Sequence, residues 1–105
     1  NKSRQYKVNM IYIKQVREAE KRIGNIYNGL IMSVQSYGFF VEIPELYVEG
    51  LVHVSTLNND WYEYRSRQNI LVGRKSKKAF KIGDSIEIKI VKVDVLKYQI
   101  DLEIV

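Results

Sequence analysis

The order of apolar and polar residues changes once along the chain, from a helical period to a strand period. From about Tyr6 to Arg22 the apolar residues recur every three or four positions among charged ones, which predicts an amphipathic helix closed by Gly24. These apolar positions are Val8, Tyr12, Val16, Ala19 and Ile23. Beyond them the period becomes two, which is typical of strands with one buried face.

Five strands are predicted from this alternation. They run from Ile26 to Val34, from the turn Ser36–Gly38 to just before Pro44, from Glu49 to Val54, from Ile86 to Val93 and from Ile100 to Ile104. Gly29 interrupts the first strand, where it predicts a bulge or a tight bend. Five short strands with one long excursion between the third and fourth favour a five-stranded Greek-key barrel, an all-β fold preceded by the N-terminal helix.

The second strand leaves aromatic side chains on both of its faces. Phe39, Val41 and Ile43 alternate into a core, whereas Phe40 points the other way and Tyr37 lies at the preceding turn. A small domain rarely exposes aromatic rings without a use, and in a basic chain the favoured use is stacking on unpaired nucleic-acid bases.

Composition narrows the class of partner. With 105 residues, 46% of them hydrophobic, the chain has room for one domain with its own core. The formal net charge of +5 and the isoelectric point near 9.4 indicate an anionic partner, although a membrane surface or an acidic protein fits the charge alone. The chain has no cysteine, which excludes disulfides and thiolate metal sites and suits the cytoplasm, and no apolar run is long enough to cross a membrane.

The excursion from Thr56 to Gly83 carries an aromatic cluster and a basic run. We expect Trp61, Tyr62 and Tyr64 to pack this long loop onto the barrel. The cations form a solvated face that attracts phosphate, with purely solubilising surface as the alternative. The basic run comprises Arg74, Lys75, Lys77, Lys78 and Lys81.

Two segments, Ser36 to Glu42 and Glu49 to Ser55, resemble the S1 RNA-binding domain, which implies an oligonucleotide-binding (OB) barrel of the S1 type. A longer series of segments resembles the C-terminal S1 domain of ribonuclease R and its ribonuclease II relatives. These segments are Gly50 to Leu57, Asn59 to Tyr64, Leu71 to Gly73, Phe80 to Asp84, Val93 to Asp94 and Gln99 to Glu103. The resemblance runs from about Gly24 to Val105, so we expect a helical connector over residues 1–23 and an S1 domain over residues 24–105.

The resemblance also implies which residues contact RNA. The family's RNA-binding face falls on Tyr37, Phe40, His53 and Asp94, although a structural role is the alternative for a lone histidine. Tyr98 stands where the family usually has arginine or lysine, and either Lys97 or stacking by Tyr98 itself compensates for the lost cation. With these six residues, the basic residues Arg74, Lys75, Lys77 and Lys78 complete the predicted RNA-binding set.

No arrangement in the sequence indicates catalysis by this chain. The resemblance implies a parent exoribonuclease that degrades RNA from its 3′ end, with magnesium held by clustered carboxylates in a catalytic domain elsewhere in the same protein. We therefore expect no cofactor here, and expect single-stranded RNA and that catalytic domain as partners. The alternatives are an S1 module of a translation factor, polynucleotide phosphorylase or ribosome-associated protein, or a structural or protein-interaction barrel. The helix is expected either to pack on a preceding domain or to cover the open end of the barrel.

Overall fold

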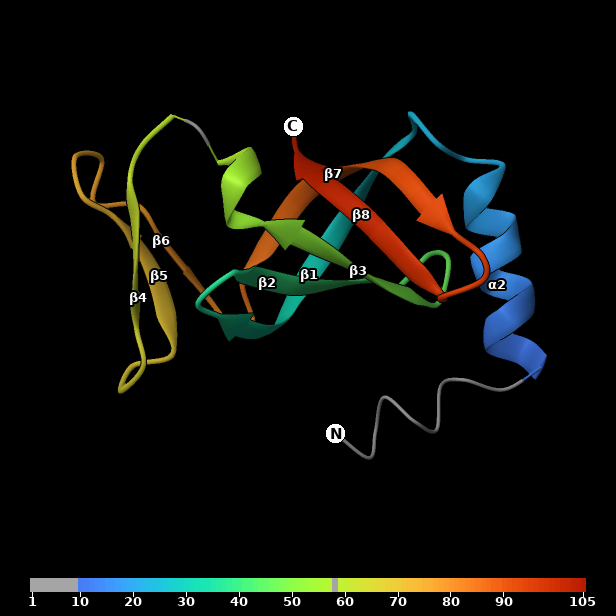
Figure 1. The fold of residues 1–105 in the computed structure, drawn as a ribbon, viewed down its shortest axis with the longest axis horizontal. Helices are drawn as coiled ribbons and strands as arrows, with labels where there is room; N and C mark the ends of the chain where they lie inside the picture. The colour runs from blue at the N-terminus through green and yellow to red at the C-terminus, as the bar shows by residue number, and fades with distance from the viewer. Residues whose placement is uncertain (1–9, 58) are drawn as a thin grey trace.

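The structure, a computed structural model, describes residues 10–57 and 59–105 and has three parts in a row. Figure 1 shows helix α2 (Met10–Glu20) at one end, a closed barrel in the middle and a small separate sheet at the other end. The first positions of the predicted helix, Tyr6 and Val8 among them, lie outside the described residues. Within the described residues, no helix combines the length and the hydrophobicity that crossing a membrane requires.

Five strands form the barrel, as the sequence predicted. They are β1 (Ile26–Gln35), β2 (Gly38–Ile43), β3 (Val48–His53), β7 (Ser85–Asp94) and β8 (Gln99–Ile104). Their order around the barrel is β1-β2-β3-β8-β7, and the pairing of β1 with β7 closes it. All neighbours are antiparallel except β3 and β8, which run parallel.

The core follows the predicted alternation. Phe39, Val41 and Ile43 of β2 have no exposed surface, whereas Phe40 and Glu42 on the other face are half-buried. Gly29 was predicted to mark a bulge or a tight bend in β1, but the bulge lies between Ile31 and Ser33. A β-carbon at Gly29 would overlap the Val41 side chain, so this glycine allows β1 to approach β2 closely.

The segment between β3 and β7 contains regular secondary structure, so the prediction of a long loop was incomplete. After a short 3₁₀ helix, η1 (Val54–Thr56), it forms a three-stranded antiparallel sheet. The strands are β4 (Tyr62–Arg65), β5 (Ile70–Gly73) and β6 (Ala79–Lys81). One face of this small sheet packs on the barrel, where the Phe80 ring stacks on Phe39 with 4.9 Å between centroids.

The aromatic cluster divides between the two faces of the small sheet. Tyr62 and Tyr64 alternate onto the inner face and pack against the core, as predicted, and the Tyr62 ring lies 5.5 Å from that of Phe80. The prediction that Trp61 also packs was wrong, because its side chain is 73% exposed. Trp61 directly precedes Tyr62, and neighbouring residues of an extended strand point to opposite faces.

Helix α2 lies against the end of the barrel. Val16 and Ala19 are fully buried where the helix packs on β7 and β3, and Tyr12 is half-buried against the same core. Ile23 was expected on this apolar face but is 49% exposed, because the helix ends three residues before it. Among the described residues, the helix therefore covers one end of the barrel.

The stacking of Phe80 on Phe39 should carry much of the stability of the small sheet. Replacing the 3% exposed Phe80 with alanine should lower the free energy of unfolding by about 3–5 kcal/mol in urea denaturation. Ile82→Ala, two residues away at a 52% exposed position, is the control and should change it by no more than about 0.5 kcal/mol. Equal effects of the two substitutions would show that the small sheet does not depend on this contact.

Candidate nucleic-acid interface

A groove of about 410 Å³ crosses the outer faces of three barrel strands. Register places Phe40 of β2 opposite Leu51 of β3, and Leu51 opposite Asp101 of β8, so these three side chains form a row across the sheet. Helix α2 adds Tyr12 to one wall of the groove. The described residues that line the groove are Tyr12, Tyr37, Phe40, Glu49, Gly50, Leu51, Lys97, Tyr98, Gln99, Ile100 and Asp101.

Two predicted residues, Tyr37 and Phe40, meet in this groove. Their ring centroids lie 6.3 Å apart at an interplanar angle of 85°, an edge-to-face contact that leaves Tyr37 44% exposed. Gly38 between them has a φ of +152°, and a β-carbon there would collide with the backbone carbonyl of Val52. The sequence therefore needs glycine at this position to hold the two rings above β3.

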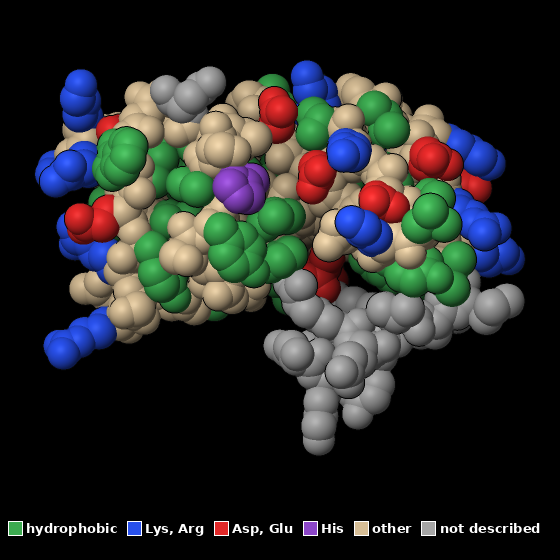
Figure 2. Space-filling view, in the orientation of Figure 1, with side chains coloured by type: hydrophobic (Ala, Val, Ile, Leu, Met, Phe, Trp, Pro, Cys, Tyr) green, Lys and Arg blue, Asp and Glu red, His purple; other side chains and the backbone are tan. Residues whose placement is uncertain are grey.

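His53 lies beside these rings, outside the groove lining. It is opposite Gly38 at the end of β3, and the next residue donates its backbone N–H to the Tyr37 carbonyl at 2.8 Å. The backbone N–H of Ser55 donates to His53 Nδ1 at 3.1 Å. Because a backbone N–H only donates, the neutral ring carries its proton on Nε2. Figure 2 shows the chain's single histidine on the surface next to hydrophobic side chains.

The turn from β7 to β8 places Lys97 and Tyr98 in the groove. Asp94 does not line the groove itself, and its Oδ1 accepts the backbone N–H groups of Leu96 and Lys97, each at 3.1 Å. Tyr98 has a φ of +56°, which a non-glycine residue adopts at some cost. The carboxylate of Asp94 thus holds the turn in the shape that presents the other two side chains.

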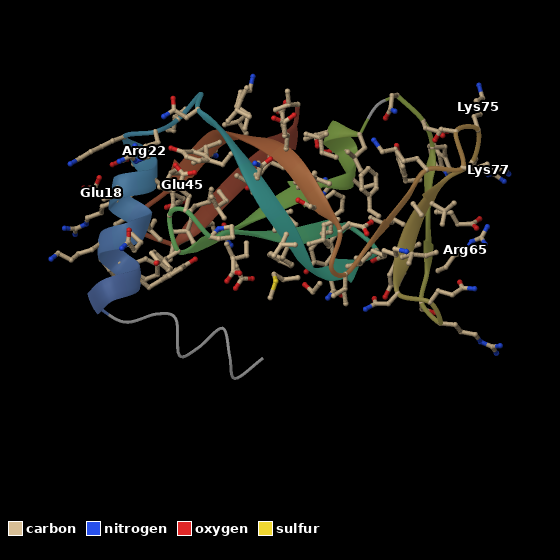
Figure 3. The ribbon with its side chains drawn as sticks, turned by 180° about the vertical axis from the view of Figure 1, so that it is seen from behind. Glu18, Arg22, Glu45, Arg65, Lys75 and Lys77 are labelled. Carbon is tan, nitrogen blue, oxygen red and sulfur yellow. The ribbon has the colours of Figure 1, made fainter. Side chains whose placement is uncertain are left out.

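The predicted basic run is not brought into the groove. Among the described residues, the groove is lined by one cation, Lys97, and by two carboxylates, Glu49 and Asp101. Arg74, Lys75, Lys77 and Lys78 are exposed in and beside the β5–β6 hairpin. Figure 3 shows Lys75 and Lys77 at the small-sheet end of the molecule, together with Arg65 and away from helix α2.

The carboxylate of Asp60 holds this basic hairpin in place through hydrogen bonds. It accepts the backbone N–H groups of Trp61 at 2.7 Å, Lys75 at 3.1 Å and Ser76 at 2.8 Å, together with the Ser76 hydroxyl at 2.8 Å. These hydrogen bonds, the Ser76 N–H first among them, lower the pKa of Asp60 from 3.8 to about 2. The hairpin and the start of β4 are therefore joined through one charged group.

Sequence reasoning missed several lining residues. Glu49 and Leu51 share the outward face of β3 with His53, so the period of two that placed His53 would have found them. Tyr12 depends on how α2 packs, which no local pattern encodes. Among residues 10–57 and 59–105, no group of three or more His, Cys, Asp or Glu side chains gathers in a way that could hold a metal ion.

Comparison with known proteins shows to which family the chain belongs. Residues 20–105 match the model of the S1 RNA-binding domain, and the chain belongs to that family. It is 50% identical over 93 residues to the acetazolamide conferring resistance protein zam of Synechocystis sp., covering 89% of this chain and 12% of that protein. It is 36% identical over 96 residues to ribonuclease R of Thermotoga maritima, covering 91% of this chain and 13% of that protein.

Solved structures agree with this assignment. Mycoplasma genitalium ribonuclease R in complex with ribose-methylated single-stranded RNA superposes with a TM-score of 0.80 at 29% identity, covering 86% of this chain and 14% of that one. The chain thus spans 12% to 14% of the length of these relatives.

The lowered pKa of Asp60 predicts a pH dependence of stability. A carboxyl whose pKa falls on folding stabilises the fold fully above its unfolded pKa of 3.8, and the contribution is lost as the pH drops toward about 2. The difference in unfolding free energy between the unchanged chain and Asp60→Asn should therefore shrink between about pH 5 and pH 2 in urea titrations. A difference that stays constant over this range would contradict the assignment of the hydrogen bonds to the charged carboxylate.

Proposed function

We propose that this chain binds single-stranded RNA in the groove over β2, β3 and β8. The observation that carries the proposal is the partly exposed pair Tyr37 and Phe40, held at the groove by Gly38 in a chain of the S1 family. Unpaired bases stack on such rings, each stack contributing about 1–3 kcal/mol, whereas bases inside a duplex are not accessible to them.

Polar groups around the rings contact the rest of the nucleotide. Lys97 binds phosphate at the groove, and Tyr98 beside it offers a further ring for stacking. His53 donates from Nε2 to a phosphate or a base edge. Asp94 acts by holding the turn that carries Lys97 and Tyr98. Arg74, Lys75, Lys77 and Lys78 attract the RNA backbone electrostatically.

The larger protein is, in this proposal, a hydrolytic 3′-to-5′ exoribonuclease resembling ribonuclease R, located in the cytoplasm. This chain is its C-terminal substrate-holding module, which captures RNA and leaves cleavage to a catalytic domain with magnesium. The support is the similarity to ribonuclease R over most of this chain and the absence of cysteine, which suits a reducing compartment.

Titration of the chain with single-stranded and duplex RNA of equal length tests the function. Single strands should bind more tightly, and their log affinity should fall linearly with log salt as counterions are released. Tyr37→Ala combined with Phe40→Ala should weaken single-strand binding by a few kcal/mol, on the order of 2–6, because two stacking rings are lost.

The matched control is Ile26→Ala combined with Ile82→Ala, two 52% exposed apolar residues that do not line the groove. It should leave the affinity unchanged, and thermal melting should find both double variants folded. Equal binding of duplex and single strand, or an intact affinity in the Tyr37/Phe40 variant, would refute the proposed site.

The position of Tyr98 allows a test of charge against stacking. Tyr98→Arg places a cation at the groove, so binding should tighten at low salt and the log–log salt slope should steepen by up to about 0.7. The φ of +56° strains tyrosine and arginine alike, so the exchange does not alter the backbone cost. Fluorescence titrations at three salt concentrations give both quantities.

The opposite result would be as informative about Tyr98. If Tyr98→Arg weakens binding by the same factor at low and high salt, the tyrosine ring is itself a stacking contact that salt hardly affects. The cation would then not restore a missing phosphate contact.

A further inference from the structure

The small sheet carries the whole net charge of the chain. Residues 60–81 contain seven Lys and Arg and two Asp and Glu, a net charge of +5, which equals that of the full sequence. The other residues therefore balance ten cations against ten anions. Figure 2 shows several Lys and Arg side chains at the small-sheet end of the molecule, and others at the helix α2 end, where Asp and Glu lie among them. Phosphate is thus attracted to this sheet more than to the barrel.

An aromatic ring is exposed within this charged region. Trp61 is 73% exposed, but its backbone is fixed on both sides: its N–H donates to Asp60 at 2.7 Å and its carbonyl accepts the Arg74 N–H at 2.9 Å. The chain is also closely packed at Gly73, where a β-carbon would lie 2.5 Å from Asp60 Oδ2 and 2.6 Å from Ser76 Oγ. The backbone of Trp61 and the basic hairpin are therefore held together at this point.

The pairing of β4 with β5 sets the tryptophan beside the cations. Tyr62 pairs with Gly73, so Trp61 lies opposite Arg74, one step further along the same ladder. The hairpin then continues through Lys75, Lys77 and Lys78. An exposed indole next to several cations combines the two properties that single-stranded nucleic acid requires, a stacking surface and charge along the backbone.

In the part of the chain that the structure describes, the barrel groove is weak in the second of these properties. The lining residues within 10–57 and 59–105 include two carboxylates and one cation, so these residues supply rings with little attraction for phosphate. His53 stands at the end of β3 from which the chain passes through η1 into the small sheet (Figure 1). RNA leaving the groove on the His53 side therefore approaches the basic sheet.

We propose that the β4–β6 sheet is a second RNA subsite, in which Trp61 stacks on a base and Arg74, Lys75 and Lys77 bind the flanking phosphates. This inference rests on the proposed function and extends the RNA footprint from the groove, past His53, to the far end of the molecule. A longer strand occupies both subsites, and a short one occupies only the groove. An acidic protein surface is the competing occupant of the basic sheet.

Oligouridylates of about 5 and about 16 nucleotides separate the two subsites, because OB folds cover between about 4 and 16 nucleotides. Trp61→Ala should weaken binding of the longer RNA about fivefold or more, the equivalent of one lost stack, and leave the shorter RNA within about twofold. Trp61→Phe should retain most of the affinity. Lys75→Ala combined with Lys77→Ala should reduce the salt slope for the longer RNA by up to about 1.4.

The matched control is Tyr47→Ala, which removes a 74% exposed aromatic ring from the turn between β2 and β3, outside the basic sheet. It should change the affinity for neither RNA. Figure 3 shows Glu45 of the same turn near α2, at the opposite end from Lys75 and Lys77.

Three results would overturn the second subsite. If Trp61→Ala leaves both lengths unaffected while the Tyr37/Phe40 variant weakens both, the proposed function stands and the basic sheet serves another partner, such as an acidic protein. If Trp61→Ala weakens both lengths equally, the ring acts through the barrel and not through a separate contact. If the unchanged chain binds neither RNA, the proposed function and the second subsite fail together.

Discussion

The parallel pairing of β3 with β8 is the constraint on which the rest of the molecule depends. It joins Leu51 to Asp101 and Val52 to Leu102, and it is the contact that brings the last strand beside the third. The strands meet closely at Gly50, where a β-carbon would lie 2.6 Å from Leu102 Cγ and 3.0 Å from the Ile100 carbonyl. This pairing forms the floor of the groove and sets Lys97 and Tyr98 beside Phe40.

A parallel pair also requires the chain to leave the sheet and return, since two parallel strands cannot be joined by a tight turn. The connection here contains η1, the small sheet and β7. Closing the barrel and carrying the basic sheet are therefore consequences of one topology. The stacking of Phe80 on Phe39 then fixes the small sheet against the barrel core.

The barrel was predictable because its strands keep a period of two over most of their length and have enough apolar residues to define a buried face. Phe39, Val41 and Ile43 are an example in which the pattern alone gives the correct orientation. The small sheet was not predicted, because its strands have three or four residues and their polar positions carry charges that are typical of a surface loop. Its inner face is completed only by the barrel, which no local pattern reveals.

The candidate site was predictable to the extent that it lies on single strands. Tyr37 and Phe40 follow from β2 and its turn, whereas the contribution of Tyr12 depends on the packing of α2. The exposure of Trp61 was available in principle, since Tyr62 and Tyr64 already occupy the inner face of β4. Treating the segment as a loop concealed that alternation, because packing is the commoner role for an aromatic residue in a loop.

Stacking and charge are largely separated in this molecule, and Asp60 explains how the charged part is built. At physiological salt a cation acts over about 8 Å, so the hairpin cations attract mainly the phosphates that come near them. The carboxylate of Asp60 accepts three backbone N–H groups, which could otherwise bind an anion directly. Phosphate must therefore be bound by flexible lysine and arginine side chains, which adapt to a backbone irrespective of sequence. An acidic residue within the basic sheet thus lowers its charge by one while giving Trp61 and the hairpin a fixed geometry.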